Sequence, residues 1–163
     1  MNETTVKIRT DVDYLQKTAE FIKALNQAHG RQIDTVDELG TLRMRMRLIK
    51  EEARECEEAA LSFQEAVCLL EHAKHLWEGE KAPDVTLDDV RKRKAELLKE
   101  LSDLLYVVFG MAVTFDLPIA EAFLRVHESN MSKLGEDGKP LYREDGKVLK
   151  GPNYKAPDLL DLC

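Results

Sequence analysis

The chain has 163 residues, which is enough for one domain with a real core but short for two. Charged residues make up 34% and aromatic residues only 6%, a balance that favours an all-α fold over a sheet. The net charge of −7 argues against a nucleic-acid polymer held over a broad surface. A small phosphorylated ligand bridged by a metal ion stays compatible with this charge.

The first ten residues lack the basic and apolar segments of a signal peptide, and no apolar run is long enough to span a membrane. We therefore expect a soluble, cytoplasmic protein that does not contact a membrane. Cys56 and Cys68 are separated by about 18 Å along one predicted helix, which is too far for a disulfide. We expect these two residues and Cys163 to be free thiols.

Apolar residues at helical spacing, together with start and stop signals, predict four main helices. They run from Asp11 to about His29, from the capping-box residues at 35–38 toward Trp77, from Thr86 to about Phe115, and from Asp116 to Leu134. The last ten residues of the third helix are almost uniformly apolar, so it should be the most buried element. The expected architecture is a single all-α domain, an antiparallel bundle of four to five helices with its core at about 11–134.

The segment after Gly135 has a different character. Two turn dipeptides, Asp137-Gly138 and Asp145-Gly146, predict a short hairpin followed by an extended stretch. Lysines and arginines make this end locally basic in an acidic protein. Residues 135–163 are thus either a solvated tail or a lid over a bound anion.

Carboxylates in the second and third helices occupy positions that border the buried face. In the second helix, Glu52 and Glu55 form a row with Leu48 and Ala59, beside an apolar row that starts at Ile49. The third helix repeats this arrangement, with Glu100 and Asp103 in a row between Glu96 and Val107, beside an apolar row that starts at Leu97. The two helices therefore carry matching acidic rows.

If these rows face each other, four carboxylates converge inside the bundle. Two unit charges about 5 Å apart repel by roughly 3 kcal/mol at an effective dielectric near 20, and several such pairs rival the stability of a domain. The site must then take up protons or bind a cation. Oxygen ligands without nearby His or Cys favour Mg²⁺, with Mn²⁺ as the substitute. A solvated acidic helix face is the alternative, and two motifs in matching register make it less favoured.

The sequence resembles the all-α nucleoside triphosphate pyrophosphohydrolases, a superfamily that includes MazG proteins, dimeric dUTPases and phosphoribosyl-ATP pyrophosphohydrolase. The resemblance covers about residues 42–158. It rests on Glu51-Glu52-x-x-Glu55, Glu100-x-x-Asp103, the run from Leu104 to Gly110, the Ser-Asn-Met-Ser-Lys segment at 129–133 and the Asp-Gly-Lys segment at 145–147.

The resemblance implies a helical bundle, usually a homodimer, that cleaves nucleoside triphosphates between the α and β phosphates to give a monophosphate and pyrophosphate. By that comparison, Mg²⁺ is held by Glu52, Glu55, Glu100 and Asp103, and Glu51 activates the attacking water. The comparison assigns the nucleotide to Asn130 and Lys133, and closure over phosphate to Lys150 and Tyr154. The 44 residues between Glu55 and Glu100 are more than is common in the family, which puts the oligomeric arrangement in question.

Two alternatives stay open. One is hydrolysis of a different pyrophosphate bond, such as that of phosphoribosyl-ATP. The other is a non-catalytic helical scaffold whose carboxylates bind a structural metal or surround a regulatory nucleotide. Glu51 favours catalysis, because a carboxylate outside the ligand row is what water activation requires.

Overall fold

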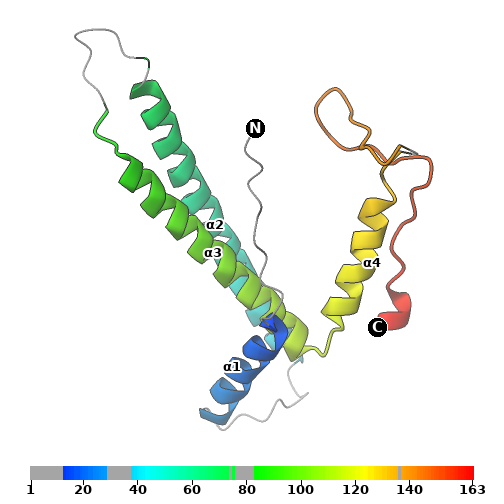
Figure 1. Ribbon diagram of the computed structural model, residues 1–163. Helices are drawn as coiled ribbons and strands as arrows, with labels where there is room; N and C mark the ends of the chain where they lie inside the picture. Colours follow the sequence, from blue (N-terminus) through cyan, green and yellow to red (C-terminus); the bar gives the residue numbers. More distant parts are fainter. Residues whose placement is uncertain (1–12, 29–37, 74, 76–82, 136) are drawn as a thin grey trace. The chain divides into compact units, whose positions relative to one another are not determined.

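The structure is a computed structural model, and it describes residues 13–28, 38–73, 75, 83–135 and 137–163. Its α-helices are α1 (Tyr14–Ala28), α2 (Glu38–Ala73), α3 (Leu87–Thr114) and α4 (Ile119–Met131), and a short 3-10 helix, η2 (Leu160–Leu162), lies near the C-terminus (Figure 1). No strand occurs in the described part of the chain, so the predicted all-α class is confirmed.

Side-chain caps fix the starts of two helices. The Asp13 carboxylate accepts a hydrogen bond from the Gln16 amide at 2.9 Å before α1. At the start of α3, the Thr86 hydroxyl accepts the Asp89 amide at 3.2 Å, and the Asp89 carboxylate accepts the Thr86 amide at 2.9 Å. This reciprocal pair is the capping arrangement predicted there. The cap expected at 35–37, the stop at Gly30 and the extension to Trp77 lie outside the described residues.

The chain forms two compact units with a boundary after Val113: α1, α2 and α3 make up the first, and α4 with the C-terminal tail makes up the second. The expectation of one domain over residues 1–163 therefore stays a prediction.

In the first unit, α2 and α3 lie side by side and run antiparallel (Figure 1). Helix α1 contacts the C-terminal half of α3, where the Phe21 and Tyr106 rings meet edge to face with centroids 5.7 Å apart. Ile22, the next residue of α1, is only 5% exposed. The core of this unit is small, since Ala59, Ala66 and Ala112 are its other buried apolar residues among those described.

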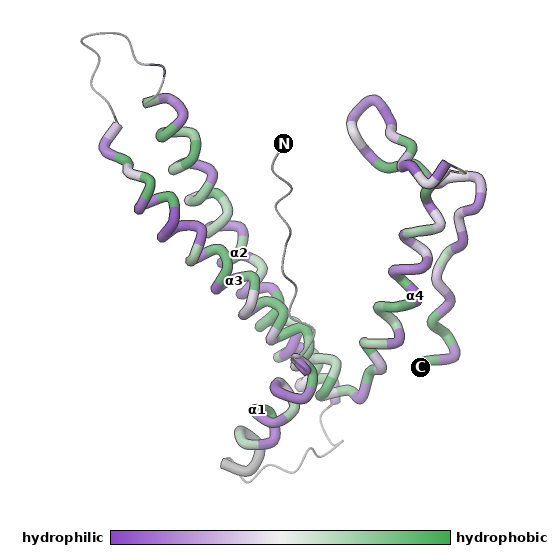
Figure 2. Tube along the Cα trace, in the orientation of Figure 1, coloured by the Kyte–Doolittle hydropathy of each residue, from purple (hydrophilic) through white to green (hydrophobic). Residues whose placement is uncertain are grey.

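The burial pattern differs from the sequence prediction in one important respect. Figure 2 shows hydrophobic residues concentrated in the C-terminal half of α3, and this end was expected to be the most buried. Within the single chain it is not, because Leu105 is 55% and Tyr106 38% exposed. Apolar side chains can remain exposed here because α3 contacts α2 and α1 along part of its surface only.

No single helix in the described residues has the length and apolar composition to cross a membrane; α3 and α4 meet that test only when taken together as one interrupted span.

In the second unit, α4 ends at Met131, three residues before the predicted end at Leu134. The last turn tightens, since the Lys133 and Leu134 amides donate to carbonyls three residues back. The hairpin prediction is confirmed in minimal form. Tyr142 and Val148 form a single antiparallel bridge, and Gly146 takes the positive φ of 83° that its turn requires.

Candidate active site

The contact between α2 and α3 has a regular antiparallel register. Small buried residues of α2, Ala59 and Ala66, allow the helices to approach closely. Arg93 of α3 crosses to α2, where it donates to the Ser62 carbonyl at 3.0 Å and pairs with Glu65 at 3.1 Å. Two turns away in the same register, Glu52 and Glu55 of α2 meet Glu100 of α3.

These three carboxylates form the candidate site. One oxygen from each of Glu52, Glu55 and Glu100 lies within 4.8 Å of the others. Glu100 is only 6% exposed, and Glu52 and Glu55 are half-buried. The acidic rows do not merely border the buried face, as the sequence suggested. The α2 row continues into the buried residues Ala59 and Ala66, so the acidic residues are part of the helix contact itself.

The electrostatics of the cluster favour either a proton or a cation. Burial raises the pKa of Glu52, and the negative charges of Glu55, Asp103, Glu100 and Glu51 raise it further. The pKa of Glu100 is lowered, chiefly because the Lys99 ammonium donates a 2.8 Å hydrogen bond to its Oε1 atom. One ammonium therefore supplies part of the positive charge that the cluster needs.

The other oxygen of Glu100, Oε2, is buried and has no hydrogen-bond partner among the described residues. A buried carboxylate oxygen without a partner carries a substantial desolvation cost. Together with the converging oxygens of Glu52 and Glu55, this atom fits a hard divalent cation, which prefers oxygen ligands.

The remaining residues predicted for this site lie at its edge. Asp103 is not part of the three-carboxylate group, and its carboxylate lies 3.3 Å from the Lys99 ammonium. It is close enough to raise the pKa of Glu52. Glu51 is exposed and also acts on Glu52 through its charge. Both carboxylates therefore act on the cluster through their charge without belonging to the three-residue group.

The predicted nucleotide-binding residues all belong to the second unit, where they form two pairs. The Lys133 ammonium donates to the Asn130 side-chain oxygen at 2.6 Å. The Lys150 ammonium lies 4.2 Å from the centroid of the Tyr154 ring, a cation–π contact. The buried Gly151, which follows Lys150, connects the two pairs through the backbone. Its amide donates a hydrogen bond to the Lys133 carbonyl at 3.0 Å.

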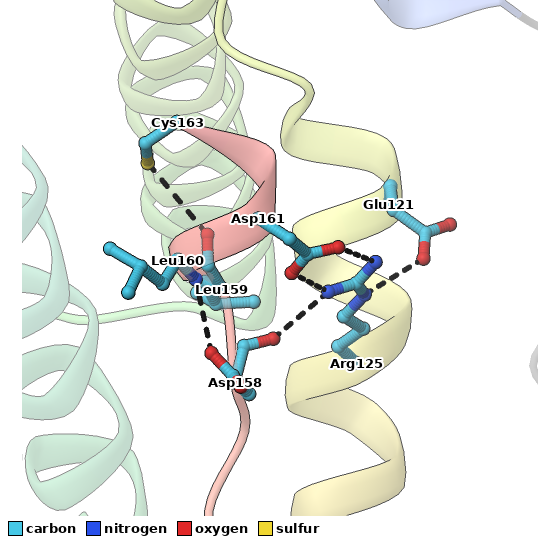
Figure 3. A network of polar contacts seen from close by, with 7 residues as sticks. All are labelled: Glu121, Arg125, Asp158, Leu159, Leu160, Asp161 and Cys163. Atoms are coloured by element: carbon cyan, nitrogen blue, oxygen red, sulfur yellow. Dashed lines mark hydrogen bonds and ion pairs between the residues drawn. The ribbon is translucent and has the colours of Figure 1, made fainter.

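The tail is tied to α4 by contacts that sequence reasoning did not find. Ser129 donates to the Lys155 carbonyl at 2.7 Å, and Ser132 accepts the Lys155 amide at 2.9 Å. Farther along, the Arg125 guanidinium forms a bidentate ion pair with the Asp161 carboxylate, as Figure 3 shows. The available signal was the polar row of Arg125, Ser129 and Ser132, which follows helical spacing along α4 to its C-cap.

Lys99 and Arg45 were also missed by the sequence analysis. Lys99 bridges Glu100 and Asp103 from the position directly before the acidic motif. Arg45 of α2 lies next to Gly110 of α3, in the same helix contact as the carboxylates. A Cβ atom added to Gly110 would be 3.1 Å from the Arg45 Nη1 atom. A basic residue next to acidic ones usually indicates a solvated face, which is why neither stood out.

Two antiparallel helices that bring a partly buried carboxylate cluster together are a framework suited to a metal-dependent hydrolase. The sequence model of the phosphoribosyl-ATP pyrophosphohydrolase family (PRA-PH) matches residues 18–130, more than half of the chain, and the chain belongs to this family within the MazG-like nucleoside triphosphate pyrophosphohydrolase superfamily. It is a pyrophosphohydrolase, a hydrolase of phosphoric anhydrides. A search of curated proteins found no match.

Proposed function

We propose that the protein is a Mg²⁺-dependent pyrophosphohydrolase that cleaves a nucleoside triphosphate between its α and β phosphates to give a monophosphate and pyrophosphate. The observation that carries this proposal is the cluster of Glu52, Glu55 and Glu100 with the buried, unpartnered Glu100 Oε2 atom. Membership of a pyrophosphohydrolase family argues against the non-catalytic scaffold.

In this proposal, Glu52, Glu55 and Glu100 would hold the ion, and Asp103 would be available as a further ligand if it separated from Lys99. A bound divalent cation supplies positive charge to the phosphate oxygens and fixes their orientation. The Lys99 ammonium occupies part of this electrostatic position in the described structure, 2.8 Å from Glu100 and 3.3 Å from Asp103. A bound cation would therefore compete with the Lys99 ammonium for these carboxylates.

The proton of the attacking water goes to Glu51. This carboxylate is exposed and lies outside the three-residue cluster, so it stays free to act as a base. The water oxygen forms a bond to phosphorus, and the bond between that phosphorus and the bridging oxygen breaks. Nucleoside monophosphate and pyrophosphate are the products, and no covalent enzyme intermediate is required.

The second unit supplies cations for the phosphates. Asn130 holds the Lys133 ammonium, and Tyr154 holds that of Lys150, so both cations have defined positions before substrate binds. Preorganised cations lose less conformational freedom when they meet an anion. We propose that these residues contact the nucleotide and that the basic tail closes over its phosphates.

A second substrate has specific support. The matching family is described as phosphoribosyl-ATP pyrophosphohydrolase, so phosphoribosyl-ATP is the competing candidate. Its cleavage uses the same bond and the same carboxylates, and the two substrates differ in what is attached to the base.

We also propose that the active form is a homodimer. Leu98, Leu101 and Leu105 form a row on α3 at helical spacing, and 44–66% of each side chain is exposed in the single chain. Burial of such a row against the same row of a second copy would complete a core that is small in one chain. Light scattering coupled to gel filtration tests this: a dimer that Leu98→Glu dissociates supports the proposal, and a wild-type monomer at micromolar concentration overturns it.

A turnover screen tests the catalytic proposal. The common ribo- and deoxyribonucleoside triphosphates and phosphoribosyl-ATP are incubated with Mg²⁺ or with EDTA, and the products are separated by ion-exchange chromatography. Glu52→Gln should abolish turnover, whereas Glu58→Gln, an exposed carboxylate of α2 that pairs with Arg54, should not. Diphosphate with orthophosphate as products, or no turnover of any compound, contradicts the proposal.

A further inference from the structure

Arg45 is a half-buried arginine of α2 without an anionic partner among the described residues. Its Nε atom is buried and makes no hydrogen bond there. Three helices meet around its guanidinium: a Cβ atom on Gly110 of α3 would lie 3.1 Å from its Nη1 atom and 3.7 Å from Ile22 Cδ1 of α1. The first unit thus encloses the guanidinium in part, and its Nε atom is buried.

Such a position is energetically unfavourable unless something else binds there. Burial of a charge without a partner costs free energy, and burial lowers the pKa of Arg45. Arg93 occupies the same helix contact, yet it has both the Ser62 carbonyl and the Glu65 carboxylate as partners. Unlike Arg93, Arg45 therefore has no anionic partner among the residues that the structure describes.

Arg45 lies in line with the carboxylate cluster. It precedes Glu52 by seven residues, which returns to the same helix row and spans about 10 Å along the axis of α2. Gly110 follows Asp103 by the same seven residues on α3. The register that brings Glu55 to Glu100 therefore also brings Arg45 to Gly110, two turns farther along the same helix contact.

Gly110 keeps room for this guanidinium. Glycine inside a helix costs roughly 1 kcal/mol relative to alanine. An added Cβ atom would stand 3.1 Å from Nη1, tighter than nearly all real contacts of this kind. The chain thus carries a residue of low helix propensity at a position in α3 where a larger one would press on Arg45.

We propose that Arg45 is a substrate-binding residue that receives a phosphate group about two helical turns from the carboxylate cluster. This rests on the proposed function, since it places a second phosphate beyond the one at the metal ligands. The guanidinium fork matches the oxygens of phosphate and donates two hydrogen bonds at once. Two parts of the candidate substrates supply this chemistry: the terminal phosphate of a triphosphate chain and the 5′-phosphate of a phosphoribosyl group.

Calorimetric titration tests the proposal with two probes, inorganic tripolyphosphate with Mg²⁺ and ribose 5-phosphate. The variants are Arg45→Met, which keeps the apolar stem, and Arg45→Lys, which keeps a point charge. Arg43→Met and Arg47→Met are matched controls, because both arginines are exposed and lie about 200° around α2 from Arg45. The Michaelis constant is measured in parallel for each compound that the wild type turns over.

Arg45→Met should lower the affinity for one probe about 10- to 100-fold, the effect expected for loss of a charge-assisted bidentate contact. Arg45→Lys should recover part of this loss, and the controls should bind as the wild type does. The probe that is weakened identifies the source of the phosphate. Without ligand, the thermal midpoint of Arg45→Met should equal or exceed that of the wild type, because an unpaired buried charge has been removed.

Unchanged affinity for both probes in Arg45→Met overturns the proposal, as does a wild type that binds neither. A lowered thermal midpoint or altered oligomeric state with unchanged affinity also overturns it, since Arg45 would then pair with a second copy of the chain. Failure of the proposed function has a different result. The wild type would then turn over none of the compounds, while Arg45→Met would still bind one probe more weakly than the wild type does.

Discussion

Glu52→Gln should stabilise the metal-free protein and abolish its response to Mg²⁺. The Glu52 and Glu55 oxygens lie within 4.8 Å of each other. Two charges at that separation repel by about 3.5 kcal/mol at an effective dielectric of 20 and by about 1 kcal/mol in bulk water. Glutamine has the same shape and no charge, so the free energy of unfolding in EDTA should rise by about 1–3 kcal/mol.

Urea denaturation in EDTA and in millimolar Mg²⁺ measures both effects. Wild-type protein should gain stability from Mg²⁺ because the ion binds only the folded chain, and Glu52→Gln should gain little. Glu58→Gln is the control with the opposite sign. It removes an exposed carboxylate that pairs with Arg54 at 2.6 Å, so it should leave stability unchanged or lower it, and it should keep the Mg²⁺ response. If Glu52→Gln lowers stability in EDTA as an ordinary ion-pair mutant does, the repulsive cluster is refuted.

Lys99→Met removes the ammonium that bridges two carboxylates, so Mg²⁺ should bind about 3- to 10-fold more tightly by calorimetry; weaker binding would contradict competition between the two cations. Gly151→Ala places a Cβ atom 2.6 Å from the backbone oxygens of Lys133 and Leu134, so amide exchange in the tail should accelerate, and unchanged exchange would contradict this close packing. Arg125 lowers the pKa of Asp161, so this contact stabilises the tail above the ordinary pKa of 3.8 and is lost as pH falls through the lowered value. Proteolysis of the tail by an acid-active protease should therefore speed up as pH falls below about 3.8 in the wild type but not in Asp161→Asn, and equal slopes would exclude the contact as the cause.

The helices were predictable because local signals fix them. The Thr86–Asp89 capping pair and the apolar periodicity locate α3 to within a residue of its observed start. The end of α4 was less predictable. Ser132 bonds to the Lys155 amide, a partner 23 residues away that periodicity cannot reveal.

The acidic residues of the site were also predictable, but the face they occupy was not. Two neighbouring rows of α2, one through Ile49 and one through Glu52, differ by only about 100° around the helix. Hydrophobicity favours burial of the apolar row through Ile49. The structure buries the other at Ala59 and Ala66, because small residues allow the closest approach to α3.

Arg45 and Lys99 could not be assigned from sequence for a related reason. Each is a basic residue among many, and its significance depends on what lies across the helix contact. The counterpart of Arg45 is Gly110, 65 residues away in sequence, and only the antiparallel register brings them together.

The central claim is that the facing helices α2 and α3 hold a divalent cation between Glu52, Glu55 and Glu100. Anomalous diffraction from crystals grown with Mn²⁺, the usual substitute for Mg²⁺ at oxygen sites, tests it most directly. We expect a strong anomalous peak next to oxygens of these three carboxylates, with Lys99 displaced from Glu100. Fully formed α2 and α3 with no peak at the cluster, or a peak only at other carboxylates, would contradict it.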